Sequence, residues 1–82
     1  MDVREATLAL LAARAEDATV CPSEVARAVV GPDGRWRDAM PEVHAAIDQM
    51  MGEGLVRLSW KGRALVTRAG PYRIGRGAHV RA

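Results

Sequence analysis

The spacing of the apolar residues changes at Gly52 and Gly54, and this change constrains the fold more than any other feature of the chain. Before the two glycines, apolar side chains recur with the period of about 3.6 residues that is typical of an amphipathic helix, in the stripe Val43, Ala46, Ile47, Met50 and Met51. After them the period is two, through Val56, Leu58 and Trp60. Helical sequence followed by strand sequence in 82 residues predicts one small α+β domain.

Three helices are expected before the change of period. The first covers residues 2–15, where the apolar side chains gather on one side. The second covers 22–30 and starts at Pro22, because proline at the first helical position loses no hydrogen bond that the helix could have made. A turn at 31–34 and a single helical turn at 35–40 lead to the third helix at 41–53, which the two glycines end.

The remainder of the chain predicts short strands. A strand at 55–60 is followed by a turn at 61–63, a return strand at 64–66 and a further strand at 72–74. Three helices followed by a β-hairpin is the order of a winged helix, the helix-turn-helix variant whose strand pair is called the wing. We therefore expect an α+β winged helix with a two- to three-stranded antiparallel wing, in a domain of residues 1–76 followed by a flexible C-terminal tail at 77–82.

Charge is distributed unevenly along the chain. Residues 1–54 hold ten Asp and Glu against five Arg, a net charge of −5, and residues 55–82 hold six Arg and one Lys with no carboxylate, a net charge of +7. Such a cationic segment attracts phosphates, acidic protein surfaces or the acidic half of its own chain, and charge alone does not choose among them.

Several classes of site find no support in the sequence. The single cysteine, Cys21, excludes an internal disulfide, and His44 and His79 lack the spacing of metal ligands. The glycine-containing turn at 31–34 has neither the lysine nor the Ser or Thr of a phosphate-binding loop. We therefore expect no enzyme, cofactor or metal, and, without a membrane span or secretory signal, a cytoplasmic location.

Four segments of the sequence resemble a known bacterial family. These are 21–28 (CPSEVARA), 36–41 (WRDAMP), 61–63 (KGR) and 70–74 (GPYRI), and with them the chain is similar over about residues 3–76 to the family catalogued as domain of unknown function 3253. The resemblance implies a winged-helix-like fold in a small cytoplasmic bacterial protein and implies no established activity. Some members of that family are fused to a zinc-ribbon-like segment, which hints at work on nucleic acid, but this chain lacks those cysteines.

The basic hairpin is the leading candidate for a binding surface. Cations along one strand face and its loop would contact phosphates and give salt-dependent affinity without reading sequence. The candidate residues are Arg57, Lys61, Arg63, Arg68 and Arg73 in the wing, with Arg35 and Arg37 before the third helix. We expect nucleic acid, most plausibly duplex DNA, as the partner; the alternatives are a solvated strand face that balances the acidic helices, or a protein-interaction or dimerisation surface.

The third helix offers little for reading bases. Its exposed side carries carboxylates, and only Gln49, with His44, has groups suited to base edges. We expect this face to meet solvent or a protein partner.

The aromatic residues and the cysteine each have a plainer structural role. Trp36 is a candidate to stack on an unpaired base, but in a chain without phenylalanine a core position is favoured, and the alternation of Trp60 with Leu58 favours burial as well. Cys21 is expected to be a small, partly buried apolar residue.

Overall fold

The helices begin and end close to the positions that the sequence predicts. The computed structural model describes residues 1–78, with α1 at Val3–Ala12, α2 at Pro22–Val30, the 3-10 turn η1 at Trp36–Ala39 and α3 at Met40–Gly52. The Asp2 side chain accepts a hydrogen bond from the backbone N–H of Glu5 and so caps α1. Helix α1 ends earlier than expected, and Ala15, placed on its apolar side, is exposed.

Three antiparallel strands follow the helices. Strands β1 (Val56–Trp60), β2 (Arg63–Leu65) and β3 (Arg73–Arg76) form one sheet in the order β2-β1-β3. Lys61 and Gly62 form the tight turn between β1 and β2, with φ values of 51° and 81°. Positive φ at both turn residues matches the right-handed twist of a hairpin. Val20, before α2, makes an isolated bridge to Ile74 in β3, which the sequence did not predict.

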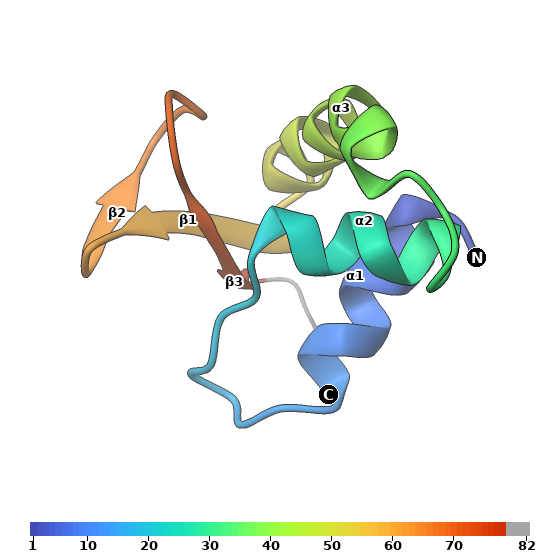
Figure 1. Cartoon of the computed structure of the whole chain (residues 1–82). Coiled ribbons are helices and arrows are strands. Elements are labelled where there is room, and N and C mark those ends of the chain that lie inside the picture. Colours follow the sequence, from blue (N-terminus) through green and yellow to red (C-terminus); the bar gives the residue numbers. More distant parts are fainter. Residues whose placement is uncertain (79–82) are drawn as a thin grey trace.

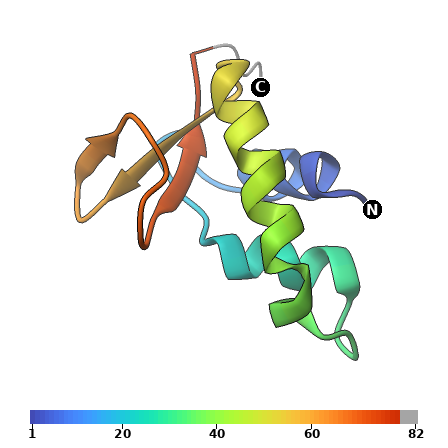
Figure 2. The same cartoon turned by 90° about the horizontal axis from the view of Figure 1, so that it is seen from above.

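The helices pack beside the inner part of the sheet, and the far end of the hairpin extends past them (Figures 1 and 2). The core contains side chains from all three helices and from the sheet, among them Leu11, Val25, Ile47, Leu58 and Ile74. Thr7 is also buried, and its hydroxyl donates to the carbonyl of Val3 at 2.7 Å, which satisfies it inside α1. The arrangement confirms the α+β prediction and is consistent with a winged-helix-like fold.

Trp60 differs from the expectation that it is buried. The alternation of β1 is real, because Val56 and Leu58 are buried, but Trp60 on the same face keeps 38% of its surface exposed. Trp60 is the last residue of β1, at the end of the hairpin that extends past the helices in Figure 2. The prediction that it is buried is therefore wrong, because alternation identifies the face of a strand but not the length over which helices cover that face.

Trp36 was expected either to lie in the core or to be free to stack on a base, and its environment is intermediate. The ring is partly buried and packs against the core. The guanidinium carbons of Arg27 and Arg37 lie 4.6 and 4.4 Å from its centroid, within the range of cation–π attraction. A base stacked on this ring would have to displace an arginine, so the indole serves here as a support for cations.

No helix within the described residues has both the length and the apolar character needed to cross a membrane.

Candidate nucleic-acid interface

Two of the predicted wing cations hold the fold together. Arg68 forms a two-pronged ion pair with Asp48 of α3, with Nε–Oδ1 at 2.9 Å and Nη2–Oδ2 at 3.0 Å. Arg73 donates from Nε to the hydroxyl of Thr19 and from Nη2 to its carbonyl. Forked contacts of this kind orient a guanidinium firmly, and both side chains are turned to their own chain.

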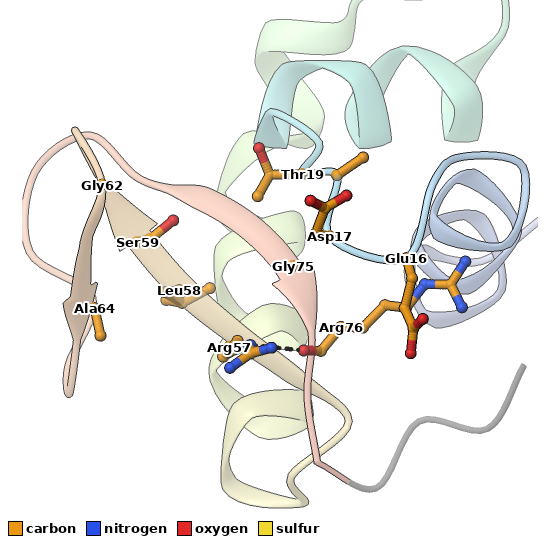
Figure 3. Close-up of a pocket in the computed structure, with 11 residues that line it drawn as sticks. Glu16, Asp17, Thr19, Arg57, Leu58, Ser59, Gly62, Ala64, Gly75 and Arg76 are labelled. Atoms are coloured by element: carbon orange, nitrogen blue, oxygen red, sulfur yellow. Dashed lines mark hydrogen bonds between the residues drawn. The ribbon is translucent and has the colours of Figure 1, made fainter.

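Arg57 belongs to a different surface from the tip of the wing. Its Nε donates to the carbonyl of Arg76, and it lines a hollow of about 270 Å³ beneath the loop that follows α1. Figure 3 shows Glu16 and Asp17 on the loop side of this hollow and Arg57 on the strand side. Carboxylates beside Arg57 oppose the approach of phosphate, so this hollow is a poor place for nucleic acid.

Arg76 also turns inward, although the sequence singled out no role for it. Its Nη2 donates to the carbonyls of Leu11 and Arg14 at 2.8 and 3.1 Å. These carbonyls lie at and just after the end of α1, where the Leu11 carbonyl also accepts from the backbone N–H of Arg14, so the arginine adds a side-chain donor to the carbonyls at this helix end.

Four of the exposed predicted cations make no polar side-chain contact within the described residues. Within residues 1–78, the side chains of Arg35, Arg37, Lys61 and Arg63 take no part in an ion pair or a side-chain hydrogen bond. Arg35 and Arg37 lie at η1, and Lys61 and Arg63 lie at the tip of the wing. Figures 1 and 2 show these two segments at opposite ends of the molecule.

An apolar hollow lies between the two cationic segments. It has a volume of about 420 Å³ and takes its walls from the start of α2, the first turns of α3, the end of β1 and the loop before β3. Its lining residues include Met40, His44, Trp60, Pro71 and Tyr72. We refer to it below as the Trp60 hollow.

The exposed cations are neighbours of the residues that line the Trp60 hollow. Arg63 pairs directly with Trp60 across the hairpin, so the two side chains share one face of the sheet. Lys61 follows Trp60 in the chain, and η1 runs directly into Met40. Cations therefore lie next to lining residues at both ends of the hollow, and at η1 they are accompanied by the carboxylate of Asp38.

His44 and Tyr72 form a neutral pair in the wall of the Trp60 hollow. The Nδ1 atom of His44 lies 2.6 Å from the hydroxyl of Tyr72. Burial, together with the nearby positive charge of Arg68, lowers the pKa of His44, and burial raises the pKa of Tyr72 to about 12. Both rings are therefore uncharged near neutral pH, and the pair leaves one imidazole nitrogen for a further partner.

Cys21 also lines the Trp60 hollow and is partly buried, as expected. Its Sγ lies 3.0 Å from the hydroxyl of Ser23, and this hydrogen bond is the main cause of its lowered pKa. His44 lines the same hollow as Cys21, but its Nδ1 atom is hydrogen-bonded to Tyr72.

Gln49 lies away from the Trp60 hollow. It lines a separate shallow depression beside Asp2, Arg4 and Glu42, at the start of α1. The structure therefore does not bring Gln49 together with the wing, whereas His44, on the same helix, faces the loop that leads to β3.

The Trp60 hollow itself was missed by sequence reasoning. The available signal was the position of Trp60 next to the Lys61-Gly62 turn, since the tip of a hairpin is where a strand extends furthest from the core.

Comparison with known proteins identifies the family. No curated protein matches the sequence. Residues 1–77 match the family described as "Protein of unknown function (DUF3253)". The match covers nearly the whole chain and confirms the resemblance seen in the sequence, and the chain belongs to this family.

Proposed function

We propose that this protein is a cytoplasmic, non-enzymatic module that binds nucleic acid, with duplex DNA as the first form to test. The observation that supports it most directly is the set of exposed cations Arg35, Arg37, Lys61 and Arg63, which form no salt bridge with the described residues. Exposed cations without a carboxylate partner, including Arg37 on the Trp36 ring, remain available to phosphates.

The pairing of a carboxylate on α3 supports the same function. Asp48, a carboxylate on the exposed side of α3, is held by Arg68, and this ion pair lowers its pKa. Its negative charge is thereby largely balanced. Contacts through Lys61, Arg63, Arg35 and Arg37 would hold the backbone without reading bases, so we expect weak sequence preference.

The test is the charge reversal Arg63→Glu, measured by fluorescence anisotropy with a mixed-sequence duplex at low and near-physiological salt. We expect weaker binding to every sequence and a salt dependence whose logarithmic slope is flatter by about 1, because one phosphate contact is lost. The matched control is Arg4→Glu, which makes the same change of charge on α1, where Arg4 pairs with Glu53. Equal effects of the two substitutions, or no binding by the unmodified protein at low salt, would contradict the proposal.

A protein-interaction or dimerisation module is the second candidate. It is favoured by exposed apolar surface on the wing, where Val66 is 89% exposed and Trp60 is 38% exposed. Sedimentation of the purified protein over a range of concentrations detects self-association, and a dimer that does not bind nucleic acid at low salt would establish this function in place of the first.

A further inference from the structure

We infer that the Trp60 hollow receives an unpaired base of a DNA strand whose backbone is held by the cations on either side of it. The inference rests on the proposed function and deepens it, because it names the form of nucleic acid that the surface prefers. Contacts to the nucleic-acid backbone alone do not distinguish a duplex from a single strand. An aromatic ring in an apolar hollow does distinguish them, because it stacks on a base that is not paired within a duplex.

The exposure of Trp60 is the first reason. The indole of Trp60 is 38% exposed, so part of its apolar surface is in contact with water. The chain has few large apolar residues that could cover that surface. Met40 and Pro71 also line the hollow, and its volume of about 420 Å³ lies within the range of sites for small molecules. A planar base is an occupant that buries this surface.

The charge around the hollow favours a base over an apolar peptide side chain as its occupant. Among residues 1–78, no Asp or Glu lines the hollow. Of the carboxylates close in sequence to its lining residues, Glu24 and Asp48 are each paired with an arginine, and the exposed Asp38 and Glu42 line two separate depressions. Arg63 lies across from Trp60, with Lys61 beside it and Arg37 shortly before Met40. A strand with phosphates on both sides of one base matches this alternation of cation, apolar surface and cation.

The polar groups of the hollow are few. His44 and Tyr72 satisfy one another, which leaves one imidazole nitrogen to meet the edge of a base. Such a site tolerates any base. It also provides little to pair with a 2′-hydroxyl, so we assign the site to DNA and not to RNA.

The experiment compares wild type with Trp60→Ala by anisotropy, using a mixed-sequence single-stranded DNA oligonucleotide and its blunt duplex. We expect the substitution to weaken single-strand binding by about 5- to 150-fold, the value of one stacked base, and to change duplex binding less than about twofold. Val66→Ala is the matched control, because it removes an exposed apolar side chain of the same hairpin outside the hollow and should change neither.

A second measurement keeps the test valid if Trp60→Ala unfolds. In a Trp36→Phe background, Trp60 is the only tryptophan of the chain. Its fluorescence should be quenched when single-stranded DNA is added and should change little with duplex.

The outcomes separate the two proposals. Binding to both oligonucleotides with no loss in Trp60→Ala and no quenching would overturn the base site and leave the proposed function standing. No binding to any oligonucleotide at low salt would overturn both. Tighter binding to single-stranded RNA of the same sequence would contradict the assignment to DNA, and quenching by an acidic, apolar peptide but by no oligonucleotide would show that the occupant is a protein.

Discussion

Glu24 illustrates how a single side chain serves two neighbours at the start of α2. Its carboxylate accepts hydrogen bonds from Arg14, at 2.7 and 3.2 Å, and from the backbone N–H of Cys21 at 2.8 Å. The first contact links α2 to the segment that follows α1, and the second satisfies a backbone donor at the helix start. The hydrogen bonds from Arg14 are the main cause of its low pKa of about 2.

We predict that stability depends on the ionised form of Glu24. Because its pKa is about 2 in the folded protein and about 4.5 in the unfolded chain, its contribution is complete above about pH 4.5 and is lost as the pH falls towards 2. Glu24→Gln should lower the free energy of unfolding by about 1 kcal/mol near neutral pH, since the ion pair is lost. The difference between the two proteins should shrink below about pH 4.5, as measured by urea unfolding across that range.

Glu16→Gln provides the control for that experiment, because Glu16 is an exposed carboxylate that forms no salt bridge within residues 1–78. It should leave the free energy of unfolding nearly unchanged at every pH. A difference for Glu24→Gln that persists undiminished at about pH 2 would show that the loss comes from side-chain packing and not from charge.

At the level of elements, the turn between α2 and η1 depends on a close approach of the backbone. A side chain on Gly34 would collide with the side chain and carbonyl of Val30. The turn folds back so tightly because Gly34 donates to the carbonyl of Gly31 at 3.2 Å. This approach brings η1, and with it Arg35 and Arg37, against the end of α2.

We predict opposite effects for alanine at two glycines. Gly34→Ala should lower the free energy of unfolding by about 1–3 kcal/mol, because Val30 must move to admit a methyl group. Gly52→Ala is the matched control, because Gly52 is the last residue of α3 and a methyl group there would meet no other atom. This substitution should raise the free energy of unfolding by up to about 1 kcal/mol. Thermal unfolding of both variants checks the pair, and equal losses of stability would show that the turn is not tightly packed.

The elements that sequence predicted well are those with a local pattern. The helices and the alternation of β1 follow from residues that lie within a turn or two of each other, and the observed ends agree to within a few residues. The bridge from Val20 to Ile74 has no such pattern, because a single pair of residues has no period. The same limit explains Trp60, whose exposure depends on where the helices end.

On the scale of the whole molecule, the uneven charge of the sequence is partly satisfied within the fold. Arg68 pairs with the carboxylate of Asp48 across 20 positions of sequence, whereas Arg73 and Arg76 contact uncharged acceptors of Thr19 and Leu11 across 54 and 65 positions. Sequence reasoning allowed that the basic half might meet the chain's own acidic half, but no pattern assigns partners at such separations. The candidate cations therefore divide only in the structure, where Arg68, Arg73 and Arg76 hold the fold and Arg35, Arg37, Lys61 and Arg63 stay exposed.

These long-range contacts make β3 essential to the helices before it. Ile74 is fully buried and exchanges two backbone hydrogen bonds with Val20, and Arg76 binds the carbonyls that follow α1. The first and last elements of the domain are thus joined directly. Gly77 extends the pairing of β3 with β1 by donating to the carbonyl of Leu55, while residues 79–82, part of the expected tail with His79 and Arg81, lie outside the described residues.

Truncation after Tyr72 should therefore destroy the cooperative unfolding of the whole domain, and not only the wing. The deletion removes a strand of the sheet, a buried isoleucine and the arginine that satisfies the end of α1, and a domain of this size has little stability to spare. Truncation after Ala78 is the control, because it preserves every contact described above. Circular dichroism during thermal unfolding distinguishes the results. A sharp transition in the shorter protein would show that the helices form a core without β3. The contacts between the two ends of the chain would then be a consequence of the fold and not one of its causes.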